Sequence, residues 1–180
     1  MATAHTKLMT FAEFALLPDD PNGWHQELRN GEIVTVPPPL HGHFLVQRRL
    51  RRLLDQLTGG AGEVETELGY RPTPDHNYWE ADVAFVARNR WDQIPLKGNL
   101  QGPPELVIEV LSDSNTIAEM RDKRRICLEN GGREFWVIDQ DHREVEVSTP
   151  DGRTVTYKAG EQIPLFFADG ARIPVDGIFG

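Results

Sequence analysis

The sequence predicts an α/β fold built as one domain over residues 1–180, and three observations lead to this prediction. Short aliphatic runs typical of buried strands alternate along the chain with segments of helical periodicity. Turn signals at Asn30-Gly31 and at Pro150-Asp151-Gly152 each separate two short strand-like runs. The length of 180 residues suits one compact domain, and no repeat or low-complexity linker divides it.

The N-terminal half predicts a short helix, a hairpin, a long helix and two strands. Residues 10–13 have the spacing of a capping box, and the helix they open should end before Pro18. Residues 24–36 form the hairpin around Asn30-Gly31, and three prolines follow it. The helix at 42–57 places five apolar residues on one face: Val46, Leu50, Leu53, Leu54 and Leu57. Strands are expected at 63–71 and 78–87.

The C-terminal half predicts two buried strands, a helix between them and a second hairpin. A loop rich in Gly, Asn and Pro covers 88–104, and the run within 103–112 (PPELVIEVLS) has the composition of a strand buried on both faces. The cluster at 112–115 is expected to cap a helix at 116–129. A strand at 134–139 and the hairpin around 150–152 follow, and the apolar tail is expected to be irregular and to pack against the core.

Composition limits the classes of function. The formal net charge is −9, so bulk electrostatic attraction does not draw this chain to nucleic acid. Any such contact must come from local basic patches or from divalent cations held by acidic residues. Cys127 is the one cysteine, no run has the length of a membrane span, and the N-terminus lacks an apolar signal core. We therefore expect a cytoplasmic protein with no membrane association.

Three charged residues interrupt segments whose neighbours are apolar. Glu109 lies at the centre of the buried run, Asp82 lies within EADVAFV, and Lys123 falls on the side of its helix that carries Met120 and Ile126. A lysine alone in such a place usually extends its ammonium group to water, and the three together form either a buried ion pair or a functional site. A lone buried carboxylate destabilises a fold unless it is paired, metal-bound or protonated, which favours the functional site.

Two carboxylates and a lysine are the groups that metal-assisted phosphodiester hydrolysis needs. Carboxylates hold Mg²⁺ while waters complete its octahedron, and the metal polarises the phosphate and activates a bound water. The lysine positions the attacking water or stabilises developing negative charge.

Several motifs in order resemble a known family. They are E-L-x-N-G-E at 27–32, a histidine near the start of the long helix, A-D-V-A-F-V at 81–86, the run PPELVIEVLS, a lysine in the next helix and E-F-W-V-I-D at 134–139. Together they resemble the Uma-type putative restriction endonuclease family within the PD-(D/E)XK nuclease superfamily. The resemblance implies a restriction-endonuclease-like core, in which helices flank a central mixed sheet, with an N-terminal and a C-terminal hairpin.

The resemblance also implies roles for individual residues. Asp82 and Glu109 would be the catalytic acids that bind Mg²⁺ or Mn²⁺, with the backbone carbonyl of Val110 as a further ligand. Leu111 occupies the usual lysine position, so Lys123 would take that role from the helix. Supporting roles would fall to Glu27, His43 and Glu119.

The resemblance makes DNA the expected partner. Contacts to its backbone would come from Arg48, Arg51, Arg52 and Arg124, although such a run is usually a solvated helix face. Two cuts on a duplex suit a homodimer or a higher homo-oligomer.

The sequence leaves three functions open. The first is a Mg²⁺-dependent DNA endonuclease, the second an inactive nuclease-fold module that binds DNA or protein, and the third an enzyme acting on RNA or nucleotides. The intact set of Asp82, Glu109 and Lys123 favours an active enzyme over an inactive module.

Overall fold

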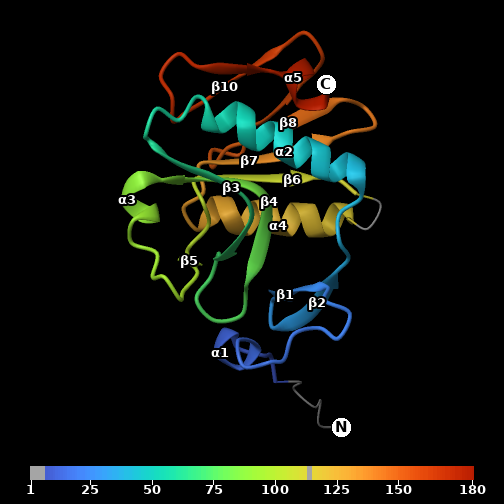
Figure 1. Cartoon of the computed structure of the whole chain (residues 1–180), viewed down its shortest axis with the longest axis vertical. Helices are drawn as coiled ribbons and strands as arrows, with labels where there is room; N and C mark the ends of the chain where they lie inside the picture. Colours follow the sequence, from blue (N-terminus) through green and yellow to red (C-terminus); the bar gives the residue numbers. More distant parts are fainter. Residues whose placement is uncertain (1–6, 113–114) are drawn as a thin grey trace.

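A seven-stranded mixed sheet forms the centre of the protein, whose computed structural model describes residues 7–112 and 115–180 (Figure 1). The strand order is β5-β3-β4-β6-β7-β8-β9. Neighbours pair antiparallel except β3 with β5 and β6 with β7. The strands are β3 (Gly62–Arg71), β4 (Trp79–Ala87), β5 (Leu100–Gln101), β6 (Leu106–Val110), β7 (Glu134–Asp139), β8 (Glu144–Ser148) and β9 (Thr154–Tyr157). The predicted mixed sheet flanked by helices is confirmed.

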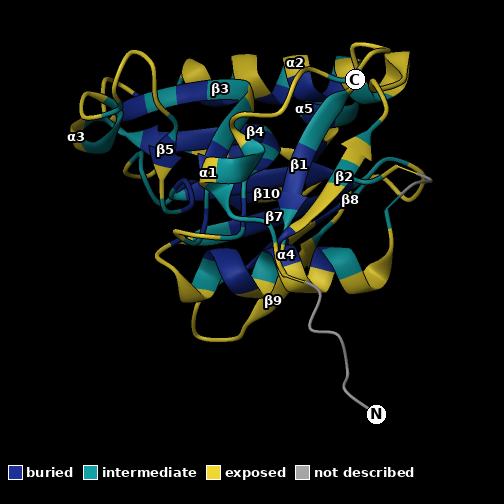
Figure 2. Cartoon of the chain, turned by 90° about the horizontal axis from the view of Figure 1, so that it is seen from below, coloured by how far each residue is buried: buried dark blue, intermediate teal, exposed yellow. Residues whose placement is uncertain are grey.

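Two amphipathic helices cover opposite faces of this sheet. Helix α2 (His41–Asp55) packs Val46, Leu50 and Leu54 into one hydrophobic cluster, which also contains Val83 and Ile108. Helix α4 (Ile117–Glu129) packs Ile126 and Cys127 into the other. Figure 2 shows the buried strands between these helices, whose outer faces are exposed. Because β6 is covered on both sides, its five residues are all buried, as the aliphatic run predicts.

The parallel pairing of β6 with β7 explains the position of α4. Parallel neighbours need a crossover connection, and α4 provides it. Its N-cap is Thr116, which forms a capping box with Glu119. The cap is thus one residue beyond the predicted cluster at 112–115, and the helix begins at Ile117 instead of 116. Asp113 and Ser114 of that cluster lie outside the described residues.

The N-terminal hairpin consists of β1 (His25–Arg29) and β2 (Glu32–Val36) and is joined to the start of β4. Asn30 and Gly31 have φ values of 50° and 80°, as the tight turn predicted from this dipeptide requires. Leu28 and Tyr78 exchange two backbone hydrogen bonds, of 2.8 and 2.9 Å. Helix α1 (Phe11–Phe14), opened by the predicted capping box at Thr10, contacts the same region. The hairpin therefore lies beside the strand that carries Asp82.

Two segments contain more regular structure than we expected. The C-terminal tail is not irregular: β10 (Gln162–Pro164) pairs with β11 (Arg172–Pro174), and α5 (Val175–Phe179) follows. It does pack against the core, through Ile163 and Ile178 among others. The predicted loop at 88–104 contains α3 (Arg88–Trp91) and β5. Arg90 stabilises it by donating to the carbonyls of Gln101 and Pro103 and to Glu105.

Strands β3 and β4 exchange faces at the level of Asp82. Residues separated by an even number along a strand normally share a face, yet Val64 lies in the α2 cluster and Tyr70 in the α4 cluster. Between them, Glu67 has a left-handed φ of 52°. The pairs Thr66–Val83 and Leu68–Ala81 flank this position, so Asp82 lies opposite the irregular residue. A local distortion of this kind redirects side chains and is common next to functional sites.

Among the described residues, no helix has the length and apolar character needed to cross a membrane.

Candidate functional site

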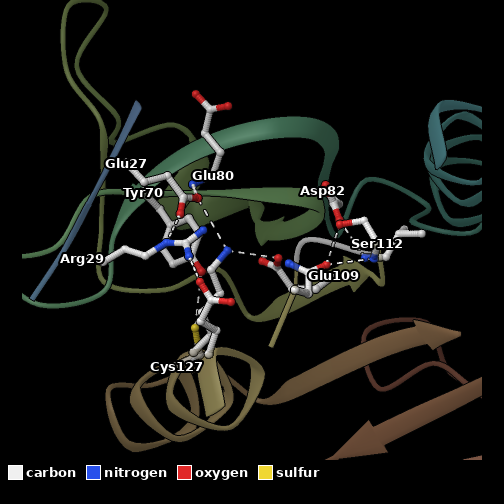
Figure 3. Close-up of polar contacts among 12 residues, drawn as sticks. Glu27, Arg29, Tyr70, Glu80, Asp82, Glu109, Ser112 and Cys127 are labelled. Carbon is white, nitrogen blue, oxygen red and sulfur yellow. Dashed lines mark hydrogen bonds and ion pairs between the residues drawn. The ribbon is translucent and has the colours of Figure 1, made fainter. Parts of the chain in front are cut away.

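Asp82 and Glu109 lie on neighbouring strands at the end of their shared ladder. The paired residues of β4 and β6 end at Val83–Ile108, and one more step of the same register places Asp82 opposite Glu109. Asp82 Oδ2 accepts a 2.6 Å hydrogen bond from the backbone N–H of Val110. The structure thus places Asp82 in contact with Val110 N–H and sets Asp82 and Glu109 on neighbouring strands (Figure 3).

Helix α2 contacts the second oxygen of Asp82. Gln47 Nε2 donates to Oδ1 over 2.9 Å, and His43 Nε2 lies 3.0 Å from the same atom. Burial lowers the pKa of His43, but the close contact with the charged Asp82 carboxylate outweighs burial and raises that pKa above its usual value. His43 and Gln47 are one turn apart, so a single face of α2 holds this carboxylate in place.

Lys123 reaches the site from the opposite face of the sheet. Its Nζ lies 3.0 Å from Glu109 Oε2 and 3.5 Å from Glu27 Oε1, and all three residues are at most 5% exposed. Burial lowers the pKa of Lys123, but the two carboxylates raise it overall. The ammonium group therefore stays charged inside the protein.

Glu109 has an unusual environment for an ion-paired acid. Burial raises its pKa, the charges of Asp82 and Glu27 raise it further, and Lys123 opposes them, with a result of about 7. Burial is the largest of these effects, so the attraction of Lys123 does not prevail. Glu109 thus changes charge near neutral pH when no cation besides Lys123 is present.

An ion-pair chain connects the hairpin to α4. Arg29 Nε donates to Glu27 Oε2 over 2.6 Å, and Arg29 Nη1 donates to Glu119. Glu27 also accepts the backbone N–H of Glu80 over 2.9 Å, and Glu119 accepts the backbone N–H of Thr116. Figure 3 shows Arg29 directed toward Glu27. Glu119, which we expected to support Lys123, has Arg29 as its ion-pair partner, and Glu27 links the two cations.

The predicted DNA-contacting arginines do not form one patch. Arg48 and Arg52 are exposed on α2, while Arg51 on the same helix donates to Glu65 and to the carbonyl of Val64. Arg124 belongs to α4, on the other face of the sheet, where it contacts Ser148 and Glu146. The structure therefore divides the predicted arginines between the two faces of the sheet.

Sequence reasoning missed Arg29 and Gln47. Gln47 had a detectable signal, because it lies on the apolar side of α2 between Val46 and Leu50 and is 2% exposed. Arg29 had none, because its partner Glu119 is 90 residues away in the sequence.

The donor set fits one divalent cation that retains several waters. Glu109 Oε1 is buried and has no hydrogen-bond partner among the described residues, so one carboxylate oxygen is left without a donor. No group of three or more His, Cys, Asp or Glu side chains within the described ranges is arranged to hold a metal. Two carboxylates plus waters match the way proteins bind Mg²⁺, so the residues suit Mg²⁺ or Mn²⁺ better than zinc.

Comparison with known proteins agrees with this fold. No sequence among curated proteins matches the chain. The crystal structure of a "putative nuclease belonging to DUF820" from Anabaena variabilis ATCC 29413 superposes with a TM-score of 0.82 at 21% sequence identity. The match covers 95% of this chain and 97% of that one, so the two share a fold. The family model Uma2, described as "Putative restriction endonuclease", matches residues 11–176, and the chain therefore belongs to the Uma2 family.

Proposed function

We propose that this protein is an endonuclease that hydrolyses phosphodiester bonds of DNA with the help of Mg²⁺ or Mn²⁺. Membership of the Uma2 family supports a nuclease. The observation that carries the proposal is the convergence of Asp82, Glu109 and Lys123 from β4, β6 and α4 on one buried cluster, in which one oxygen of Glu109 has no donor among the described residues.

The carboxylates of Asp82 and Glu109 and the carbonyl of Val110 would hold the cation. When bound, it would polarise the phosphate and supply a water with a lowered pKa. Asp82 is held by Val110 N–H and Gln47, so its carboxylate is oriented before any ligand arrives. Such fixed orientation contributes to catalysis because little reorganisation is left for the reaction itself.

Lys123 would stabilise the negative charge that develops on the phosphate oxygens. A buried ammonium acts more strongly than one in water because the surroundings screen it less. Glu27 and Arg29 would fix the position of this ammonium, since Glu27 contacts both cations. His43 would hold Asp82 from the side of α2.

One observation favours the alternative of an inactive module. Lys123 already pairs with Glu109 and Glu27, and a closed ion network of this kind can be purely structural. Such a protein would bind DNA or another protein without cutting. In it, the buried Glu109 oxygen that lacks a hydrogen-bond donor would have no role.

The test is incubation of the purified protein with plasmid, linear duplex, single-stranded DNA and RNA, each with Mg²⁺, Mn²⁺ or EDTA. We expect metal-dependent cleavage of DNA, with conversion of plasmid to linear form if two copies act together. Asp82→Ala controls for contaminating nucleases and should not cut. Cleavage that persists in Asp82→Ala, or no cleavage with either metal, would reject the proposal.

A further inference from the structure

An open pocket lies beside the charged cluster and has no part in the proposed metal site. It is formed by α1, the loop before β1, β1 and the start of β4, and its volume is about 620 Å³. Four aromatic residues contribute to its walls: Phe11, Phe14, Trp24 and Tyr78. The ring of Tyr78 lies 5.7 Å from those of both Phe11 and Phe14, and Trp24 is 45% exposed. Flat apolar rings thus line a cavity that is large enough for a heterocycle.

Polar side chains also line this pocket. His25 Nδ1 lies 3.1 Å from Glu80 Oε1, and Gln26 and Asn99 also line the cavity. These side chains offer both donors and acceptors, which the edges of nucleobases require. Figure 3 shows the Glu80 carboxylate directed away from the ion pairs around Glu27.

The pocket and the cluster share two strands. His25 precedes Glu27 by two residues on β1, and Glu80 precedes Asp82 by two residues on β4. Two residues of a strand span roughly 7 Å. The Glu80 backbone N–H also donates to Glu27, which contacts Lys123. A nucleotide next to the cleaved phosphate is therefore close enough to place its base in the pocket.

The charges around the pocket restrict what enters it. Asp19 and Asp20 lie on its rim, and they would repel a phosphate. A neutral ring avoids this repulsion, while its phosphate would remain near Lys123 and Arg29. We propose that the pocket binds an unpaired nucleobase of the substrate strand, stacked on its aromatic walls. This inference rests on the proposed function for its substrate, and it implies a single-stranded or locally unpaired nucleic acid.

Neutral nucleosides test the pocket without metal, phosphate or catalysis. Adenosine and thymidine are titrated against the EDTA-treated protein and followed by ligand-observed NMR, with deoxyribose as the probe that lacks a base. We expect dissociation constants in roughly the millimolar range for the nucleosides, and none measurable for deoxyribose. Trp24→Ala should weaken nucleoside binding about tenfold, the scale of one base stacked on one aromatic ring.

Two variants serve as controls. Trp24→Phe keeps an aromatic wall and should retain binding. Val155→Ala removes an equally exposed apolar side chain (45%) from the distant strand β9 and should change nothing. Circular dichroism of each variant checks folding, and if Trp24→Ala does not fold, Asn99→Ala, another lining residue, takes its place with the same expectation of weakened binding.

Three results would overturn the inference: no nucleoside binding, equal binding of deoxyribose, or binding that is insensitive to both Trp24→Ala and Asn99→Ala. Butylamine tests whether the acidic rim instead makes the pocket a site for cations. Preferential binding of butylamine, lost in Asp19→Asn or Asp20→Asn, would also contradict it. Nucleoside binding in a protein that cuts nothing would reject the proposed function and leave the pocket as a base-binding site.

Discussion

At the scale of single residues, the cluster holds more negative than positive charge around Glu109. Asp82, Glu27 and Glu109 act on one another, while Lys123 lies between two of them. A divalent cation would relieve this repulsion, so in the metal-free protein the contribution of Glu109 to folding stability should be smaller at high pH than at low pH. This expectation can be tested at Glu109 and at Lys123 separately.

Replacing Glu109 by Gln should stabilise the metal-free protein at pH 8 more than at pH 5.5. The folded pKa of Glu109 is about 7, above the ordinary value of 4.5. A raised pKa means that its contribution to stability is complete below about 4.5 and is lost as pH rises through about 7. Gln keeps the neutral form at every pH. Calorimetry in EDTA at both pH values measures the effect, and a lower melting temperature of the variant at pH 8 would instead indicate a structural Glu109–Lys123 pair.

Replacing Lys123 by Met should lower both cleavage and stability. Loss of one electrostatic stabiliser reduces the cleavage rate by about a hundredfold or more. Because two buried carboxylates lose a partner, unfolding free energy should fall by about 3–5 kcal/mol. Mg²⁺ affinity should stay near wild type or rise slightly, because a nearby positive charge is removed.

The matched control for Lys123 is Arg125→Met, on the exposed side of the same helix. It should change turnover and urea unfolding much less. In the double variant Lys123→Met, Glu109→Gln, part of the lost stability should return, because one unpaired buried charge is gone. Full activity in Lys123→Met, with cleavage still dependent on Asp82, would exclude Lys123 from the reaction.

At the scale of elements, the hairpin β1–β2 determines where Glu27 and Arg29 lie. Its turn depends on Gly31, whose φ is 80° and at whose position a Cβ would lie 2.6 Å from Leu8 Cβ. Left-handed backbone disfavours other residues by roughly 1–2 kcal/mol. The turn also contacts the segment before α1, because Met9 N–H donates to the Gly31 carbonyl.

Gly31→Ala should therefore destabilise the protein more than Gly152→Ala. Gly152, in the β8–β9 turn, has nearly the same φ of 83° but no atom within 4 Å of an added Cβ. Both variants have the backbone strain, and only Gly31→Ala adds the contact with Leu8. Urea denaturation of the two variants gives the comparison. Equal losses would show that the contact with Leu8 is easily relieved.

Periodicity and turn chemistry predicted the longer elements. Short elements and contacts between residues far apart in the sequence could not be predicted in this way. The helix at 42–57 is long enough to show its period, and the strand at 134–139 is an apolar run long enough to stand out from its polar surroundings. Strand β10 has three residues and β5 two, too few for any period to appear. Lys123 was found because it interrupts an apolar face, and Gln47 could have been found in the same way. Arg29 could not, because only the folded chain brings it to Glu119.

At the scale of the whole molecule, the net charge of −9 opposes the approach of any nucleic acid. Arg48 and Arg52 are exposed on α2, the helix whose His43 and Gln47 contact Asp82, so they offer positive charge near the cluster. Arg124 lies on the opposite face and pairs with Glu146. In the proposed nuclease, the arginines of the predicted set would therefore neutralise few phosphates, and the bound cation would supply much of the attraction.

Cleavage should accordingly show a shallow dependence on monovalent salt. Each neutralised phosphate contributes about −0.9 to the slope of log affinity against log salt for duplex DNA, so two arginines predict a slope of about −2. Arg52→Gln should reduce the slope by about one while the hydrolysis step itself stays unchanged. Arg153→Gln, in the β8–β9 turn, removes an exposed arginine that pairs with Asp151 and should leave the slope as it is. The measurement is kcat/KM on a short duplex at fixed Mg²⁺ over a series of NaCl concentrations. A slope that is steep in the native protein, or unaffected by Arg52→Gln, would place the DNA on a surface other than α2.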